Sequence, residues 1–413
     1  MGEMTKKPTV PAIRFKGFTD TWEQRKFSEL TEIRSASRVH KEEWKSSGVP
    51  FYRSSDVMAA LNGTENEKAF ISEELYEKLT AVSGKLEKGD VLVTGGGSVG
   101  KPYIVANNEP LYTKDADLLW IKNNEYLDPY FVYTFFFSQT FTDYLNSVSH
   151  VGTIAHYTIT QLGETPITLP CVSEQQKIGD YFRNLDSLIT LHQRKLDKLH
   201  KVKRSLLERM FPRNGANVPE IRFSGFTGAW EQRKFSDFTF AAGERNKDDL
   251  DLEPFAITNN QGFIAQSEAH DDFGYMKDVD RKMYIVVKPN SFAYNPARIN
   301  VGSLGYYEGA ENVIVSSLYE VFQTAEYVDD KFLKHWFKTK AFQDWIERLQ
   351  EGSVRLYFYY DKLCECIMSM PSVEEQRKIG AYLDKIDNLI TLHQRKLDKL
   401  RQIKRSMLEK MFV

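Results

Sequence analysis

The chain has 413 residues with a formal net charge of −2, and 41% of its residues are hydrophobic. At roughly 100–200 residues per domain, this length predicts two or three domains, each long enough to bury its own core. No apolar run approaches the ~18 residues of a membrane-spanning helix, and no apolar core follows the early lysines, so we expect a cytoplasmic protein. The three cysteines form no CxxC pair, which argues against a disulfide framework and a zinc site. The charge excludes a uniformly basic nucleic-acid binder but is compatible with locally placed cations.

The chain repeats itself, and the repeat begins close to its start. Residues 10–30 and 218–238 are identical at fifteen of 21 positions and share the run Trp-Glu-Gln-Arg-Lys-Phe. Residues 172–211 and 373–412 are identical at 27 of 40 positions. The offsets of 208 and 201 residues are far too long for a solenoid and indicate that one whole half has been duplicated.

Between these markers each half is expected to be a mixed α/β body. Strands are predicted where short apolar runs are bounded by Gly, Asn or Pro. In the first half these runs are residues 89–96, 101–108, 116–122 and 165–170. In the second half they are residues 291–296, 311–323 and 364–371, the last including Cys364 and Cys366. An aromatic helix is predicted after Asp128 and again after Asp329, because Asp is a favourable N-cap residue.

The two bodies share a frame but differ in the loop that each presents. Residues 97–100 align with residues 302–305, and the second copy has about five extra residues just before this turn, around residues 295–299. A common scaffold with unlike loops suits two readers of different targets. In the first copy Ser98 and Lys101 occupy a Gly-rich hairpin tip, where they can donate to a phosphate or a base edge.

The tails are predicted to be long helices with a heptad seam. The seam residues are Leu185, Ile189, His192, Leu196, Leu199 and Leu206 in the first tail, and Ile386, Ile390, His393, Leu397, Leu400 and Met407 in the second. Lys203 and Lys404 interrupt the seam at equivalent positions. Each tail of ~38 residues reaches ~57 Å as a helix. If the halves are related by a pseudo-two-fold axis, the helices pair antiparallel; the alternative is that each packs on its own body.

Side chains that can read base edges gather in the divergent loops. Arg pairs with guanine, and Asn or Gln pairs with adenine. Together with Ser98 and Lys101, the candidates for DNA contact are Arg53, Ser54, Asn259, Asn260, Gln261, Asn295, Arg298, Asn300, Ser303 and Arg355. No catalytic residue and no metal ligand is predicted, because the histidines show no ligand spacing and no motif for S-adenosylmethionine is complete.

The ordered double set of marks resembles the DNA-specificity (S) subunit of type I restriction–modification systems. The marks are the Trp-Glu-Gln-Arg-Lys-Phe runs at 22–27 and 230–235, the Gly-Ser-(Val/Leu)-Gly turns, the segments at 152–154 and 352–354, and the Pro-x-Val-x-Glu-Gln runs at 170–175 and 371–376. The resemblance implies an α+β fold in which two target-recognition domains alternate with two helical regions that pair as an antiparallel coiled coil. The corresponding segments here are residues 1–172, 173–212, 213–372 and 373–413.

The resemblance also implies a function in defence against foreign DNA. Each recognition domain is expected to read one half of a bipartite, asymmetric DNA site, with the helices as a ruler for the spacer. Such a subunit is not an enzyme: it recruits two adenine-N6 methyltransferase subunits, and restriction subunits that translocate DNA can join. S-adenosylmethionine, ATP and Mg²⁺ are expected on those partners. The alternatives from other classes are a coiled-coil scaffold without DNA recognition and a fused methyltransferase–nuclease.

Overall fold

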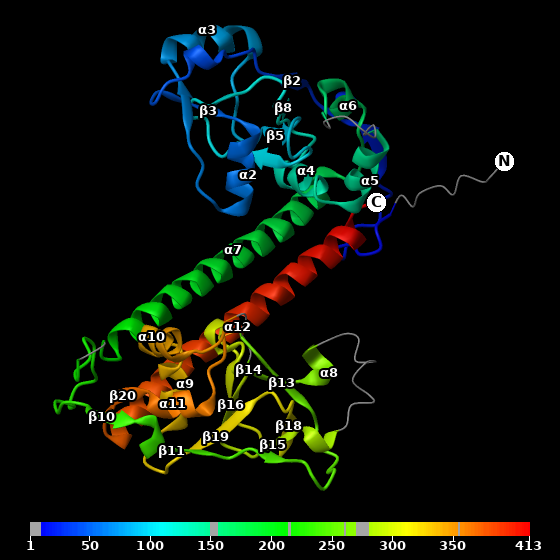
Figure 1. Ribbon diagram of the computed structural model, residues 1–413. Helices are drawn as coiled ribbons and strands as arrows, with labels where there is room; N and C mark the ends of the chain where they lie inside the picture. Colours follow the sequence, from blue (N-terminus) through cyan, green and yellow to red (C-terminus); the bar gives the residue numbers. More distant parts are fainter. Residues whose placement is uncertain (1–9, 149–155, 214–215, 260–261, 270–280, 354–355) are drawn as a thin grey trace. The chain divides into compact units, whose positions relative to one another are not determined.

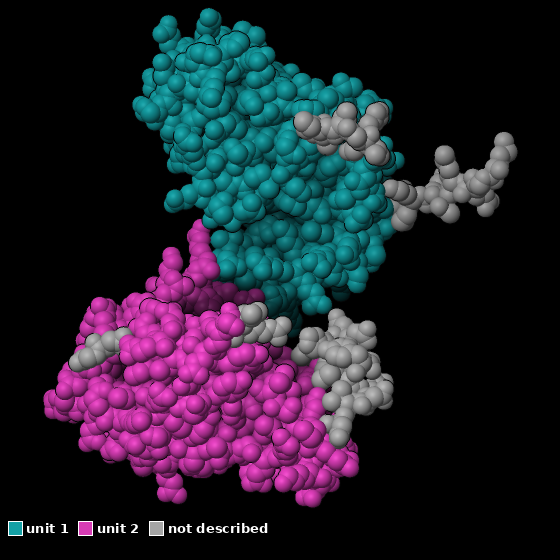
Figure 2. All heavy atoms as spheres, in the orientation of Figure 1, with its two compact units in different colours: residues 1–193, 395–413 teal, residues 194–394 magenta. Residues whose placement is uncertain are grey.

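The computed structural model describes residues 10–148, 156–213, 216–259, 262–269, 281–353 and 356–413. The chain divides into two compact units (Figure 1; Figure 2). Unit 1 comprises residues 1–193 and 395–413, and unit 2 comprises residues 194–394. Both divisions fall inside the long helices α7 (Val172–Arg209) and α12 (Val373–Met411). Each unit therefore combines one body with one half of each long helix.

The body of unit 1 is built on an antiparallel sheet of four short strands in the order β2–β8–β5–β6. These strands are β2 (Ile33–Ser35), β5 (Val91–Thr94), β6 (Pro102–Ile104) and β8 (Leu118–Ile121). Every residue of β5 and β8 is buried, and successive residues of a strand point to opposite faces. Val91 and Val93 join one hydrophobic cluster, whereas Leu92 and Trp120 join another. The sheet is therefore covered on both faces.

One of these faces packs against elements specific to the first half. They are η1 (Lys41–Glu43), β3 (Val49–Tyr52), α2 (Ser54–Asn62), β4 (Ala69–Ile71), α3 (Glu73–Ser83) and β7 (Tyr112–Thr113). The strands make a second sheet in the order β4–β3–β7. Ser72 caps α3 by accepting a hydrogen bond from the backbone N of Leu75 at 3.2 Å. The indole of Trp120 donates to Thr113 Oγ1 at 2.7 Å and joins the two sheets.

The other face packs against the helical end of the body. Its helices are α1 (Phe27–Leu30), α4 (Pro129–Phe135), α5 (Gln139–Val148) and α6 (Ile159–Glu164). Asp128 accepts a hydrogen bond from the backbone N of Phe131 at 2.8 Å, so the predicted start of this aromatic helix is confirmed. Strand β1 (Glu23–Lys26) pairs antiparallel with β9 (Pro166–Leu169), just before α7 begins.

Unit 2 repeats this frame. Its sheet has the equivalent order β11–β19–β16–β17, and Asp329 caps the second aromatic helix as predicted, accepting from the N of Phe332 at 2.8 Å. The equivalent strands are β10 (Glu231–Lys234), β11 (Thr239–Ala241), β16 (Ser291–Tyr294), β17 (Leu304–Tyr307), β19 (Glu320–Thr324) and β20 (Ile367–Met370). The equivalent helices are α9 (Asp330–Trp336), α10 (Lys340–Leu349) and α11 (Tyr360–Glu365).

The second half carries its own elements between the first two strands of the shared sheet. Among the described residues between β11 and β16, the longer elements are strands, whereas the segment between β2 and β5 of unit 1 also contains the helices α2 and α3 (Figure 1). The inserted elements are β12 (Glu244–Arg245), β13 (Phe255–Thr258), β14 (Gly262–Ala265), α8 (Gln266–Ala269), η4 (Arg281–Met283) and β15 (Ile285–Val287). Unit 2 also contains the 3-10 turn η2 (Phe235–Asp237) before β11 and the strand β18 (Val313–Val315) after β17. They make the sheet β12–β15–β18 and the hairpin β13–β14.

Within each unit the two long helices pair antiparallel. In unit 1, Lys404 of α12 donates to Asp186 of α7 at 2.5 Å, and Arg401 donates to Gln193 at 3.2 Å, so the residue numbers fall along one helix as they rise along the other. In unit 2, Leu199 and Leu206 of α7 pack on the same cluster as Ile386 and Ile390 of α12. All twelve predicted seam residues are buried or partly buried.

The end of each long helix packs into the core of one body. The end of α12 packs into the body of unit 1, and the end of α7 packs into the body of unit 2. Phe412, just past α12, stacks on Phe131 in unit 1 at a centroid distance of 5.3 Å, and Phe211, just past α7, packs on Phe332 in unit 2 at 5.2 Å. The backbone repeats the contact, because Ile13 N donates to Lys410 O at 3.0 Å as Ile221 N donates to Arg209 O at 2.9 Å. The leader of each body is also tied to a helix start, by the ion pairs Arg14–Glu174 and Arg222–Glu375, both at 2.7 Å.

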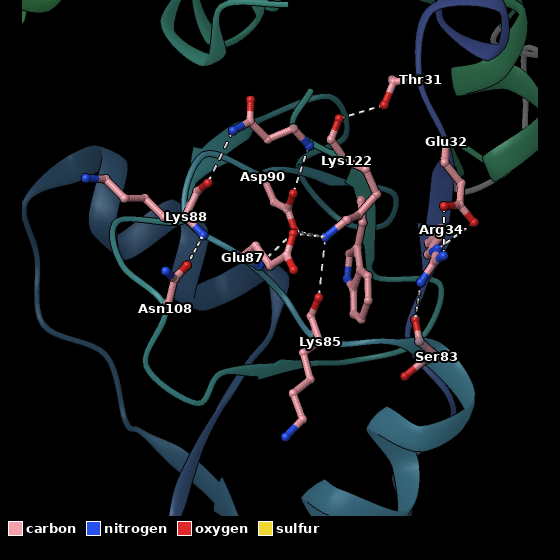
Figure 3. Close-up of polar contacts among 12 residues, drawn as sticks. Thr31, Glu32, Arg34, Ser83, Lys85, Glu87, Lys88, Asp90, Asn108 and Lys122 are labelled. Carbon is pink, nitrogen blue, oxygen red and sulfur yellow. Dashed lines mark hydrogen bonds and ion pairs between the residues drawn. The ribbon is translucent and has the colours of Figure 1, made fainter. Parts of the chain in front are cut away.

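A cluster of hydrogen bonds in unit 1 holds the start of β5 against the end of β8 (Figure 3). The buried carboxylate of Asp90 accepts from the backbone N of Glu87 at 2.9 Å, the backbone N of Asn123 at 2.8 Å and the Nζ of Lys122 at 2.7 Å. Because the buried carboxylate has enough hydrogen-bond donors, this cluster is a structural feature of the sheet.

The predicted fold class, two mixed α/β bodies alternating with two long helices, is confirmed. The expectation that Cys364 and Cys366 alternate on one strand is wrong: Cys364 lies in α11, and β20 begins at Ile367. A six-residue helix is too short to show its 3.6-residue period, and the run therefore resembled a strand. Within the described ranges, none of the helices has the length and apolarity to cross a bilayer.

Candidate nucleic-acid interface

In unit 1 the candidate loop after β5 is held by glycine and backbone hydrogen bonds. Gly95 N donates to Asp117 O and Tyr157 N donates to Gly95 O, both at 2.7 Å. A Cβ at Gly95 would lie 2.5 Å from Ala116 O and 2.7 Å from Tyr157 O, so a larger residue cannot occupy this position without moving the backbone. Residues 95–101, 114–117 and 156–157 therefore meet at one end of the shared sheet.

Ser98 and Lys101 lie on this loop, as expected for the tip of the β5–β6 hairpin. Ser98 is exposed and Lys101 is partly exposed, while the backbone N of Lys101 is fixed by Thr94 Oγ1 at 2.8 Å. The hairpin tip thus presents one hydroxyl and one ammonium group on a rigid backbone.

Arg53 and Ser54 reach the same end of the sheet but are engaged within the unit. The Oγ of Ser54 donates to Asp117 O at 3.0 Å, which joins α2 to the loop 114–117. The guanidinium of Arg53 pairs with Asp56 at 2.9 Å, donates to the backbone O of Glu67 and lies over the ring of Trp44. Both residues therefore make contacts within unit 1, and their contact with DNA stays a prediction.

Two further groups stand at this site that the sequence did not single out as DNA contacts. His156 is exposed, and a Cβ built on Gly96 would lie 3.8 Å from its Nδ1. Lys114 pairs with Asp117 at 2.9 Å. Only the fold brings these residues next to the Gly95 loop, because Lys114 lies about 20 residues and His156 about 60 residues after Gly95 in the chain.

In unit 2 the two divergent loops meet each other. The Oγ of Ser303, which is buried, donates to the backbone O of Ile257 at 3.0 Å and so connects the β16–β17 loop to β13. Gly302 has a φ of +92°, and a Cβ built there would lie 3.7–3.9 Å from Asn259. Asn259 is exposed beside this turn. Ser303 thus positions the loops rather than facing a ligand.

The extra residues of the second copy form a compact turn, η5 (Ile299–Val301), that presents Arg298 and Asn300 to solvent. Asn295 starts the turn, because its Oδ1 accepts from the backbone N of Ala297 at 3.0 Å. The backbone O of Arg298 accepts from Ser303 N at 3.1 Å, which leaves the guanidinium outside while its backbone is fixed. Asn259, Arg298 and Asn300 are therefore the predicted contacts that this face exposes to solvent.

Three predicted contacts cannot be placed. Asn260, Gln261 and Arg355 lie outside the described residues, as do residues 152–154 and Val354 of the matching turn segments.

A lysine-bearing cavity adjoins the loops of unit 2. Its volume is about 710 Å³, and Asn259 and Gly302 line one side. Another side is lined by Lys334 of α9, by Lys338 in the turn after α9 and by Lys340 at the start of α10. The equivalent residues of unit 1 are Tyr133, Phe137 and Gln139. The sequence does not mark these lysines as part of the site, because α9 comes to lie beside β17 only in the folded unit.

A cluster of ion pairs fastens α9 to the long helices of unit 2. His335 Nε2 lies 2.9 Å from Asp384 Oδ1, and Lys334 Nζ lies 3.0 Å from the same atom. Burial lowers the pKa of His335, whose side chain is fully buried. Burial alone would raise the pKa of Asp384, but the hydrogen bonds from His335 and Lys334 outweigh it and lower that pKa to about 2.

Asp387 joins this cluster and makes it a set of residue types that can ligate a metal ion: His335, Asp384 and Asp387. Its carboxylate already pairs with Lys203, and Asp384 pairs with Lys334. Ammonium groups occupy the positions that a divalent cation requires, so the cluster acts as a set of salt bridges.

Together, the two loop faces offer the two kinds of contact that sequence-specific DNA readers use. Exposed Arg and Asn side chains can form bidentate hydrogen bonds with base edges. Lysines and hydroxyl groups beside them can hold phosphates. Both faces stand on the same sheet frame, but their exposed candidates differ: the serine that is exposed at position 98 is buried at its equivalent, Ser303.

Comparison with known proteins gives a family match over most of the chain. The model of the type I restriction modification DNA specificity domain matches residues 19–201 and 257–402. A putative type I restriction enzyme specificity subunit of Haemophilus influenzae is 29% identical over 166 residues, which are 38% of this chain. The match spans 39% of the length of that relative.

A solved structure shows the same fold. The S subunit of a type I restriction-modification system from M. genitalium matches with a TM-score of 0.56 at 14% identity, covering 98% of this chain and 99% of its own. An HsdS subunit from Thermoanaerobacter tengcongensis has a TM-score of 0.43 at 15% identity, covering 95% of this chain and 96% of its own.

Proposed function

Because the chain belongs to the family of type I restriction–modification DNA specificity proteins, we propose that it reads a bipartite, asymmetric DNA sequence, one half-site with each unit. Unit 1 reads its half-site with the face around Ser98 and Lys101. Unit 2 reads the other with the face of Asn259, Arg298 and Asn300.

One observation carries this proposal: both bodies keep one sheet frame and present different loops at the same end of it. The β5–β6 hairpin and the β16–β17 hairpin are equivalent in the two sheets, yet one presents Ser98 and the other the η5 turn with Arg298. Two copies of one active site would keep the same side chains at the presenting position. Readers of two unrelated half-sites must differ there, because each base pair offers a distinct set of donors and acceptors.

In this proposal the chain supplies specificity and other subunits supply chemistry. It recruits two adenine-N6 methyltransferase subunits, and restriction subunits can join the complex. S-adenosylmethionine, ATP and Mg²⁺ bind to those partners. The helices α7 and α12 set the number of base pairs between the half-sites.

Single-molecule sequencing of methylated adenines tests the proposal in cells with and without the gene for this chain. We expect one bipartite motif to lose its methylation when the gene is deleted and to regain it when the gene is restored. If the methylated motifs stay the same while the full complex assembles and binds DNA without sequence preference, the chain is a coiled-coil scaffold. S-adenosylmethionine bound by the purified chain alone would instead favour a fused enzyme.

A further inference from the structure

A stacked pair of tyrosines stands beside the η5 turn of unit 2. The rings of Tyr357 and Tyr359 have an interplanar angle of 3° and a centroid distance of 5.6 Å. Tyr359 is 47% exposed, and Tyr357 is partly exposed. The backbone N of Phe358 donates to Pro296 O at 3.0 Å, which fixes the pair next to the turn that carries Arg298. The two rings therefore lie next to the face that is proposed to read DNA.

The backbone of this segment turns both rings towards solvent. Phe358, between them, is fully buried and packs on Phe342 in the core of unit 2 at a centroid distance of 6.1 Å. Successive residues of an extended segment point to opposite sides, so Tyr357 and Tyr359 share the outer side. Two backbone hydrogen bonds between Glu351 and Tyr357, of 2.7 and 2.8 Å, hold the segment. The rings are thus presented on a fixed backbone.

The fold does not explain why a tyrosine occupies position 359. Tyr359 is the N-cap residue of α11, and its side chain makes no capping hydrogen bond. In unit 1 the equivalent N-cap of α6 is Thr158, whose Oγ1 accepts from the backbone N of Gln161 at 3.2 Å. Ser, Thr, Asp and Asn are preferred at this position because their side chains satisfy a helix N–H. Unit 2 therefore carries an exposed ring where a capping residue would stabilise the helix better.

A flat, exposed aromatic surface beside a DNA-reading face matches the chemistry of an unpaired base. Every base has a π-face, so bases stack on aromatic side chains whatever their identity. Within a duplex the neighbouring base pairs cover these faces, and a protein ring can stack on a base only after the base has left the helix. Enzymes that modify a base take it out of the stack, so adenine methylation creates unpaired bases inside a half-site.

We propose that Tyr357 and Tyr359 form a stacking platform for one base that leaves the helix in the half-site read by unit 2. The inference rests on the proposed function, which places DNA at the face of Arg298. The base extends the stack that the two rings begin. Unit 1 has His156 and Thr158 at the equivalent positions, so the platform serves one half-site only.

Tyr359→Thr tests the platform, because it introduces the residue that caps the equivalent helix of unit 1. The assembled complex is titrated with its bipartite site and with versions that carry one abasic nucleotide at each position in turn, which leaves the opposite base unpaired. The half-site whose base preference Arg298→Ala changes is the one read by unit 2. We expect the wild type to bind more tightly than to the intact site at one abasic position of that half-site, because an unpaired base is extruded at lower cost.

The ring, and not the hydroxyl group, should carry this gain. Tyr359→Thr should lower the affinity for that abasic site by about tenfold, and Tyr359→Phe should bind as the wild type does. Tyr359→Ser is a second capping variant, and urea unfolding should show that both are at least as stable as the wild type. Phe240→Thr is the matched control: Phe240 is 51% exposed, and its partner Gln323 on β19 lies opposite the start of β16, away from the β16–β17 loop.

The outcomes separate this inference from the proposed function. A wild-type complex that gains affinity at no abasic position of the unit 2 half-site would overturn the platform, as would a Tyr359→Thr variant that keeps the gain. Equal weakening of intact and abasic sites would mean that the rings contact the paired duplex, which also contradicts stacking. A complex that prefers no bipartite sequence would contradict the proposed function, while abasic duplexes would still distinguish the wild type from Tyr359→Thr if the platform exists.

Discussion

Lys203 of α7 and Asp387 of α12 form an ion pair across the helix seam of unit 2. Unit 1 repeats the pair with the helices exchanged, between Lys404 of α12 and Asp186 of α7. The side chains are only 15–31% exposed, so the two lysines that interrupt the heptad pattern each have a partner on the facing helix. A single polar pair in an apolar seam fixes register and orientation.

The ion pair should be measurable as a coupling free energy. For Lys203→Met and Asp387→Asn we expect a double-mutant cycle in urea unfolding to give about 1 kcal/mol of coupling, because both groups are largely buried. The same cycle on the exposed pair Lys85–Glu77 is the control and should give less than half of that. Equal values for the two pairs would mean that the seam pair contributes no more than surface charge.

Phe412 should stabilise unit 1. Phe412→Ala opens a cavity beside Phe131 and Phe182, which should lower the stability of unit 1 by about 3 kcal/mol. Hydrogen exchange should show faster opening of β5 and β8 and leave β16 and β19 unchanged. Phe211→Ala should give the reverse pattern, and Phe240→Ala, at a residue 51% exposed, should change neither.

Arg298 should determine one half-site and not the other. Arg298→Ala removes an exposed guanidinium from the η5 turn and leaves the backbone hydrogen bonds of the turn in place. We expect it to cost about 1–3 kcal/mol of discrimination at one base pair. Binding to a library of bipartite sites measures this, with Lys88→Ala, on an exposed residue outside both loop faces, as the control. Equal loss of preference in both half-sites would contradict base reading by Arg298.

The lysines beside the unit 2 loops should bind phosphates. Lys338→Gln and Lys340→Gln should each lower the slope of log affinity against log salt by about 1, without changing the preferred sequence. Gln139→Lys, at the equivalent of Lys340, is the reciprocal change in unit 1 and should raise the slope if DNA follows the same path there. A changed base preference in the lysine variants would mean base contacts.

Acid should loosen unit 2 in two steps. Asp384 has its pKa lowered from 3.8 to about 2, so the stability that it contributes is present above about pH 4 and is lost as the pH falls towards 2. Burial lowers the pKa of His335, so its contribution is present above its unfolded pKa of 6.5 and is lost as the pH falls through its folded pKa. Urea unfolding from about pH 7.5 to about pH 2 measures both steps. His335→Gln should remove the step at higher pH, which belongs to His335. His156→Gln, a change on the surface, should remove neither step.

The sequence predicted those parts of the fold that leave a long or repeated pattern. The seam over 38 residues and the N-caps at Asp128 and Asp329 were visible because heptads and helix starts are local in the chain. The strands inserted between β11 and β16 were not, because strands of two to four residues carry too little pattern to separate from loops.

The candidate site was predictable only in part. The loops that carry Ser98 and Arg298 stood out because the two halves diverge there. The structural contacts of Ser303 and Arg53 did not, since a hydroxyl or guanidinium that bonds to the backbone looks the same in sequence as one that faces a ligand. Lys338 and His156 reach the loops only through tertiary packing.

The contact of Phe412 with the first body has a consequence for the order of synthesis on the ribosome. All residues of unit 2 have been made when residue 394 is added, whereas unit 1 still lacks residues 395–413. The half that is translated first is therefore the half that finishes folding last. Until residues 411 and 412 are added, its nascent chain lacks Met411 and Phe412 and exposes the apolar surface that they cover.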